Sequence, residues 1–140
     1  MATVDLTKGG TTYLPAIPGE VVKMEKQLDF SATSRSAADV LQLFDIPAGA
    51  RVLTATIQVD TAEGGTATAD LGDGDDPNGY IATANLNSAA YTGVTTEAYA
   101  DGRTYTAADT IDLVLGHDMD AAKIKVTAWV LMPSPYKAAD

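Results

Sequence analysis

The sequence predicts an all-β protein: an antiparallel, jelly-roll-like β-sandwich in a single domain with an extended N-terminal arm. Threonine and alanine are abundant, and twelve glycines and six prolines interrupt the chain, a composition typical of β structure. Short runs of alternating apolar and polar residues recur with turn signals between them, as in a sandwich or barrel. No segment is convincing as a crossover helix, which argues against a parallel α/β sheet. A length of 140 residues fits one domain.

The first 20 residues are expected to form the arm. Residues 2–7 have the composition of a short extended segment, and the run KGGTTYLPAIPG contains too many glycines and prolines for regular structure. The sandwich is expected to span residues 21–133, and residues 134–140 are expected to form a flexible C-terminal tail.

Two strands are expected in the first part of the sandwich. In residues 21–30 the apolar side chains share one face, and Lys26 is the one misfit. Residues 40–46 are expected to form the second strand, which Pro47 ends. A short helix capped by Ser36 is the alternative for this second segment.

A β-hairpin is expected over residues 51–71. The inward-facing residues of its first strand are Leu53, Ala55, Ile57 and Val59. The short connection AEGG leads to a second strand over residues 66–71, which pairs back on the first.

Five further strands are expected in the rest of the chain. They are residues 80–86, 95–100, 103–106, 110–116 and 123–132. The dipeptide Asp101-Gly102 is a strong hairpin signal between the second and third of these.

The last strand has an anomalous outer face. Ile124, Val126, Ala128 and Val130 form its apolar side, yet Trp129 and Leu131 fall on the opposite side. A sheet with one solvated side does not normally place such residues there. A second covering layer such as the arm, a subunit interface, or a bulge that changes the alternation would each explain it.

The charge and composition exclude several classes of function. A formal net charge of -10 leaves no basic surface for nucleic acid. No apolar run is long enough for a membrane span, and the first residues lack the pattern of a secretory signal. The absence of cysteine excludes disulfides and thiol chemistry. Synthesis in a cytoplasm is therefore expected.

Candidate catalytic groups are few, and no enzymatic activity or cofactor is expected. His117 is the only histidine. A metal-dependent hydrolase needs further ligands, and a serine enzyme needs a nucleophile motif beside its base, so His117 is expected to be a turn residue. The run GDGDDPNG has glycines but no lysine, and it carries too many anions to bind phosphate.

The acidic stretch DLGDGDDPNGY is expected to be a turn between two strands. Its Asp-Pro-Asn-Gly sequence favours a turn because proline fixes φ and Asn-Gly tolerates positive φ. An EF-hand is excluded, since Ala84 stands where the bidentate glutamate belongs. A calcium site of another type, built from Asp70, Asp73 and Asp75, remains the alternative.

Several motifs carry a resemblance to a known group. ATVDLTKGGTTY, the strand that ends in IPAG, the threonine-rich segment, the GDG turn, YTAADTIDLVLG and KIKVTAWVLM occur in this order. The chain resembles small virion proteins of tailed bacteriophages, of the capsid decoration or cement type. The resemblance implies a β-sandwich subunit that binds the outer surface of the shell, often as a trimer, clamps neighbouring major capsid proteins and has no catalytic residue.

With this resemblance, the expected partners are the major capsid protein and two further copies in a homo-trimer, located in the virion. No nucleic acid, membrane or small-molecule partner is expected. The candidate capsid contacts are the apolar arm residues Val4, Leu6, Tyr13, Leu14 and Ile17, which have no obvious core to join. The candidate subunit-interface residues are Trp129 and Leu131.

A phage fibre or tail appendage, or a carbohydrate-binding module, is the alternative function. A sugar-binding surface would gather exposed aromatic residues. The candidates are Tyr80, Tyr91, Tyr99 and Tyr105.

Overall fold

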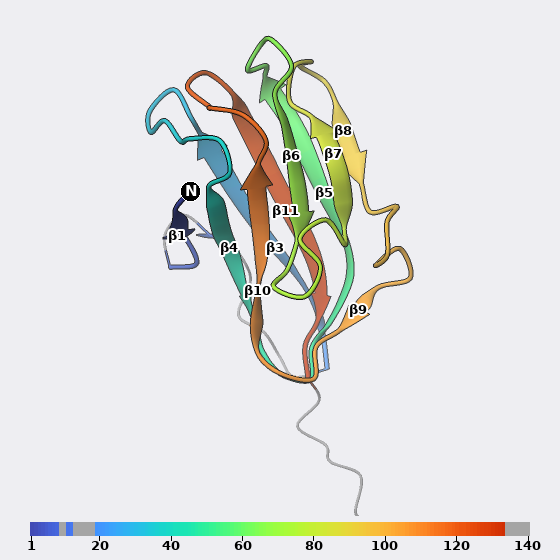
Figure 1. Cartoon of the computed structure of the whole chain (residues 1–140). Helices are drawn as coiled ribbons and strands as arrows, with labels where there is room; N and C mark the ends of the chain where they lie inside the picture. The colour runs from blue at the N-terminus through green and yellow to red at the C-terminus, as the bar shows by residue number, and fades with distance from the viewer. Residues whose placement is uncertain (9–10, 13–18, 134–140) are drawn as a thin grey trace, which may run out of the picture.

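The computed structural model is a sandwich of two β-sheets, and it describes residues 1–8, 11–12 and 19–133 (Figure 1). The described residues contain strands, turns and bends and no helix. None of them therefore belongs to a helix long and apolar enough to cross a membrane. The expected all-β sandwich is confirmed.

Within the residues that the structure describes, eleven strands form the two sheets. They are β1 (Thr3–Asp5), β2 (Thr11–Thr12), β3 (Val21–Asp29), β4 (Val40–Ile46), β5 (Arg51–Thr61), β6 (Thr68–Gly72), β7 (Ile81–Asn85), β8 (Thr92–Val94), β9 (Arg103–Thr104), β10 (Asp109–Leu115) and β11 (Lys123–Leu131). Sheet A has the order β1-β4-β10-β6-β7, and sheet B has the order β2-β3-β11-β5-β8, with β9 also paired to β5. The β1–β4 pair is parallel, and the other pairs are antiparallel.

The core lies between the sheets and follows the predicted alternation. Strands β3, β4, β10 and β11 lie within two residues of their expected bounds. The segment 40–46 is a strand and not the alternative helix. Val22, Met24 and Leu28 of β3 are buried as expected, and Lys26, the misfit, is buried among them with 2% of its surface exposed.

The predicted hairpin over residues 51–71 is wrong. β5 pairs with β11, β8 and β9 in sheet B, whereas β6 pairs with β10 and β7 in sheet A. The AEGG connection therefore crosses from one sheet to the other. Alternation specifies which face of a strand is buried but not which strand lies beside it, so two strands facing each other across the core have the same pattern as a hairpin.

The predicted strand over residues 95–100, and its hairpin with residues 103–106, are also wrong. Residues 98–101 form turns, and only Arg103–Thr104 is a strand, which pairs with β5. Side chains hold this loop, because the Arg51 guanidinium donates to the Asp101 carbonyl and to Thr104 Oγ1. Gly102 has a φ of 92°, which a side chain would disfavour.

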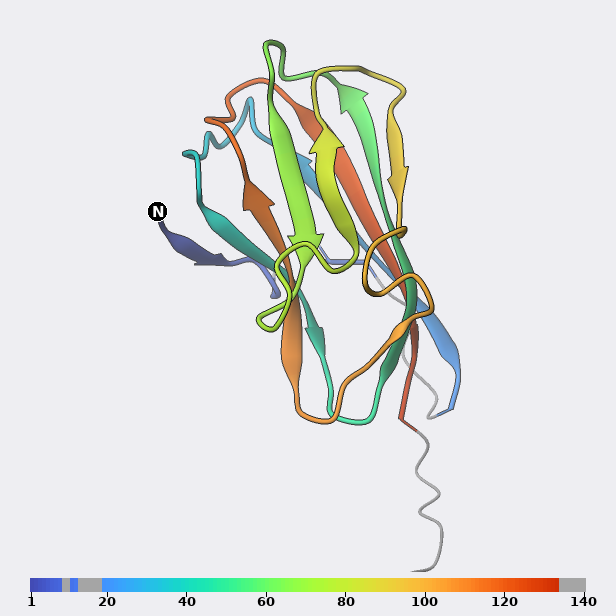
Figure 2. The same cartoon turned by 45° about the vertical axis from the view of Figure 1, so that its right-hand side comes forward.

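The described part of the expected arm belongs to both sheets. β1 lies beside β4 at the edge of sheet A (Figure 2), and β2 pairs with β3 at the edge of sheet B. The described residues of the expected arm therefore contribute one edge strand to each sheet. The proposed C-terminal tail, residues 134–140, lies outside the described residues.

Candidate functional site

The acidic turn after β6 folds back onto the end of its own strand. A Cβ at Gly72 would collide with the backbone of Asp76 and Pro77, so a glycine is required there. The first carboxylate of the turn, Asp73, accepts hydrogen bonds from the backbone N–H groups of Asp75 and Asp76 at 3.0 and 2.9 Å. The expected turn is confirmed, and its aspartate side chain closes it.

Asp73 is also the centre of a buried polar network. Its side chain has no exposed surface, and it accepts hydrogen bonds from the hydroxyl groups of Tyr99 and Tyr105 at 3.0 and 2.8 Å. The Tyr105 hydroxyl also lies 2.6 Å from that of Tyr80. Burial raises the pKa of each of these three tyrosines well above its usual value, so all three remain protonated and can donate.

Arg103 supplies the positive charge of this network. Its Nε lies 3.4 Å from Asp73 Oδ2, and its terminal nitrogen donates to Asp75 Oδ2 at 2.6 Å. The guanidinium also lies over the rings of Tyr99 and Tyr105, 4.9 and 5.4 Å from their centroids. One cation therefore serves two carboxylates and joins the turn after β6 to β9.

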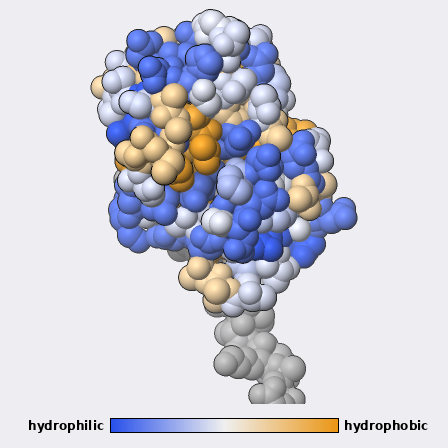
Figure 3. All heavy atoms as spheres, in the orientation of Figure 1, coloured by the Kyte–Doolittle hydropathy of each residue, from blue (hydrophilic) through white to orange (hydrophobic). Residues whose placement is uncertain are grey.

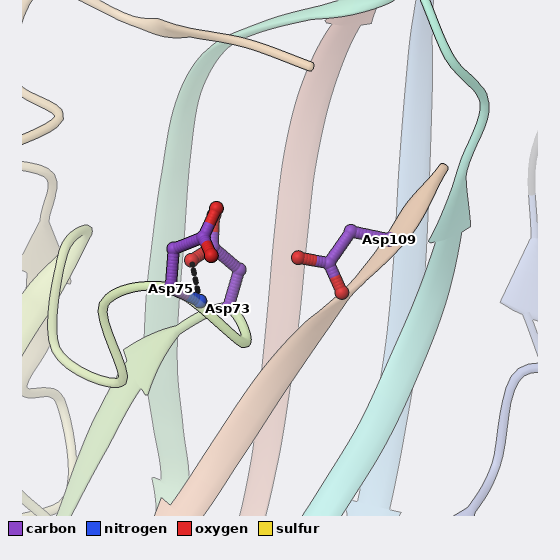
Figure 4. Close-up of side chains that lie close together, drawn as sticks. All are labelled: Asp73, Asp75 and Asp109. Carbon is purple, nitrogen blue, oxygen red and sulfur yellow. Dashed lines mark hydrogen bonds between the residues drawn. The ribbon is translucent and has the colours of Figure 1, made fainter. Parts of the chain in front are cut away.

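Three carboxylates lie close enough to be considered as cation ligands. Figure 4 shows Asp73 and Asp75 in the turn and Asp109 at the start of β10. Their carboxylate oxygens lie within 4.8 Å of one another. The alternative calcium set is corrected, because Asp70 accepts a hydrogen bond from the Thr83 N–H at 2.7 Å and Asp109 takes its place.

The hydrogen bonds of this cluster indicate a structural role. Asp73 already accepts four hydrogen bonds. Arg103 provides a counter-ion to Asp73 and Asp75. Asp73 and Asp75 are therefore engaged by internal partners, and the arrangement fastens the turn after β6 to β9 and its neighbouring residues.

The tyrosines do not form an exposed sugar-binding surface. Tyr80, Tyr99 and Tyr105 are buried, with at most 8% of their surface exposed, and Tyr91 is half-buried. The expectation attached to the carbohydrate-binding alternative is wrong. Alternation alone could not reveal this, because the tyrosines lie in loops or at strand ends and are buried by contacts among themselves, such as the edge-on Tyr80–Tyr99 pair.

Trp129 and Leu131 lie on the outer face of sheet B, as the alternation predicted. Both are half-buried. In the ladder Trp129 is opposite Lys23, and Leu131 is opposite Val21, which is 53% exposed. Leu53 has no partner between the Trp129–Thr54 and Val130–Val52 pairs, so it is the extra residue of a bulge.

This bulge corrects the predicted orientation of Leu53. The side chain is 38% exposed and not buried, whereas its neighbour Val52 faces the core. The result is an apolar cluster at one end of the outer face, which we call the sheet B patch. It consists of Val21, Leu53, Trp129 and Leu131.

The opposite face of the molecule is different in character. Figure 3, which looks onto sheet A, shows a largely hydrophilic surface whose main apolar area lies near the start of β4. The neighbouring outward-facing pair Val40–Val114 is half-buried. Among the arm candidates, Val4 and Leu6 are partly buried and pack against the core of their own chain. Tyr13, Leu14 and Ile17 lie outside the described residues.

Comparisons with known proteins show the fold of the chain. No protein-family description and no curated protein matches the sequence. A chain in the capsid of Ralstonia phage GP4 has a TM-score of 0.68 at 17% identity, over 94% of this chain and 99% of that one. A chain in the acidic stable capsid of Helicobacter pylori bacteriophage KHP30 has a TM-score of 0.63 at 14% identity, over 89% of this chain and 94% of that one. A chain in the cyanophage Pam1 capsid asymmetric unit has a TM-score of 0.60 at 16% identity, over 89% of this chain and 88% of that one.

Proposed function

We propose that this protein is a structural component of a bacteriophage virion, a decoration subunit that binds the outer surface of the major capsid protein shell and stabilises it. The observation that carries the proposal is the likeness to a chain of a phage capsid over nearly the full length of both chains. The order of motifs in the sequence supports the same conclusion independently.

The proposed mechanism is stabilisation by buried surface. A subunit that binds only the assembled shell adds its binding free energy to the stability of that shell, and a specific contact needs on the order of 1,000 Å² or more of buried area. The sheet B patch is the proposed contact between copies in a homo-trimer, because tryptophan is enriched at interfaces and exposed apolar clusters mark interaction sites. Val4 and Leu6 pack against the core of their own chain, so within the described arm they remain proposed capsid contacts only through the parts of their side chains that stay exposed.

The ion pairs and hydrogen bonds of several titratable groups support a non-enzymatic role. Asp73, Asp75 and Arg103 pair with one another. Glu63 accepts three backbone hydrogen bonds from residues 120–122. These groups hold loops together and so serve the rigidity that a shell subunit requires.

Co-sedimentation tests the proposal. The purified chain is mixed with shells that are assembled from the major capsid protein of the same phage and lack this protein. Saturable binding to assembled shells, with weak binding to unassembled capsid protein, is expected. A folded chain that stays in the supernatant at every concentration would refute the proposed role.

A further inference from the structure

The N-terminal segment closes the open side of the sandwich between β3 and β4. Its backbone is tied to sheet A through the Leu6 N–H, which donates to the Gln42 carbonyl, and through the Val40 N–H, which donates to the Ala2 carbonyl. The Ala2 N–H donates to Asp39 Oδ1 at 2.9 Å. We call residues 2–8 the closing segment.

A buried lysine of β3 lies close enough to the closing segment to interact with its negative charge. Lys26 points inward from β3 with 2% of its surface exposed. Burial lowers the pKa of this ammonium group, and the negative charges of Asp5 and Asp45 oppose that shift. A buried charge is stabilised by nearby counter-charges, and one of these two carboxylates, Asp5, belongs to the closing segment itself.

The attachment of the closing segment is nevertheless small. β1 has only three residues in register, and parallel pairing is slightly the less stable type. Hollows of about 330 and 150 Å³ lie beside it, one lined by Thr7, Lys8 and Phe44 and the other by Leu6, Leu28 and Leu41. The Lys8–Asp45 ion pair at its end is mostly exposed and contributes little. Apart from the charge of Asp5, few contacts hold this segment, so we expect its local opening to cost less free energy than unfolding of the core.

The sequence next to the closing segment favours its release as a unit. Lys8 is followed by Gly9-Gly10, and glycine has the widest backbone freedom of all residues. An opened segment would leave Lys26 without the charge of Asp5 and would expose Val4 and Leu6. The vacated position then favours a replacement with the same Val-Asp-Leu sequence.

We propose that the closing segment is exchanged between copies, so that residues 2–8 of one chain pair with β4 of a neighbouring chain. The occupant is a second copy, because an exchanged segment remakes every contact seen here without new surface complementarity. Neighbouring copies in an assembly raise the effective concentration of the segment and favour exchange. This inference does not depend on the shell, and purified protein tests it.

Cysteine pairing tests the exchange directly, because the natural chain contains no cysteine. Thr3 and Val40 are register partners in the β1–β4 pair. The double variant T3C/V40C should form a disulfide within one chain, which shows that the geometry permits the bond. A mixture of separate T3C and V40C chains should then form covalent mixed dimers under oxidising conditions.

The control replaces V40C by S88C, because Ser88 is exposed and lies in another loop. Exchange predicts about tenfold or more mixed dimer for T3C with V40C than for T3C with S88C. Equal yields, together with ready closure of the double variant, would overturn the proposal. If that double variant does not close, the second register pair, D5C with Q42C, gives the same comparison.

Discussion

At the scale of single residues, Asp73 is the group on which the loops at the end of β6 depend. It accepts hydrogen bonds from two backbone N–H groups and two tyrosine hydroxyls. We expect D73N to lower the free energy of unfolding by about 2–3 kcal/mol, because hydrogen bonds to a charged group are lost or weakened.

The matched control is D75N, since the Asp75 side chain is 74% exposed and shares the same arginine. Its cost should be below about 1 kcal/mol, as for other exposed ion pairs. Urea denaturation of both variants measures the difference. Equal costs would show that the buried network is not what fastens the loops.

Asp112 gives stability a distinct pH dependence. Burial raises its pKa to about 6, although a hydrogen bond from Thr110 opposes the shift. The folded state therefore holds this proton more tightly than the unfolded state, whose value is near 3.8. This group stabilises the fold most at low pH, and its contribution is lost as the pH rises to about 6.

The difference between the native chain and D112N isolates this contribution. From about pH 4 to pH 6 the free energy of unfolding of the native chain should fall relative to that of D112N, and above that range the difference should be constant. Urea titrations at several pH values measure it. A difference that does not change with pH would contradict the assigned pKa.

At the scale of elements, Glu63 links two connections that run from one sheet to the other, the one between β5 and β6 and the one between β10 and β11. It lies between β5 and β6, and its carboxylate accepts the N–H groups of Asp120, Ala121 and Ala122 in the loop before β11. Partial burial alone would raise its pKa, but these hydrogen bonds together lower it. We expect E63Q to cost about 1–3 kcal/mol of unfolding free energy, with faster hydrogen exchange at residues 120–122.

The control for this variant is E97Q, because Glu97 is exposed. It should change neither the stability nor the exchange of residues 120–122. Unchanged protection of these amides in E63Q would show that the loop is held by other contacts.

The sequence predicted strands better than their pairing. Alternation located β3, β4, β10 and β11, because burial of one face imposes a period of two. It failed for the hairpins at residues 51–71 and 95–106, where neighbours in the sequence lie in different sheets or where side chains replace the ladder.

The candidate sites show the same limit. The outward position of Trp129 followed from alternation. The outward orientation of Leu53 did not follow from alternation, because it results from a bulge that forms where β5 pairs with β11. Asp109 joins Asp73 from far along the chain, and no local pattern places these two carboxylates together.

At the scale of the whole molecule, the sheet B patch is the proposed interface between copies. We expect the native chain to form a trimer in solution, and W129A to shift it towards the monomer, because tryptophan dominates many interfaces. Trp129 is only half-buried in the single chain, so the fold should persist. Light scattering together with circular dichroism measures both properties.

V114A is the matched control for this test, because Val114 is half-buried on the outer face of the other sheet. It should leave the mass of the oligomer unchanged. A native chain that is a monomer at all concentrations, or a W129A trimer as stable as the native one, would contradict the role given to the sheet B patch.

The thermal stability of shells tests the central claim most directly. Shells that lack this protein are heated with and without a saturating amount of the purified chain, and the disruption temperature of the shell is recorded. Binding to the assembled shell alone predicts a higher disruption temperature, which saturates as the sites fill and follows the binding curve. Binding that leaves this temperature unchanged would contradict the account, because a subunit that binds the shell without stabilising it is not a cement protein.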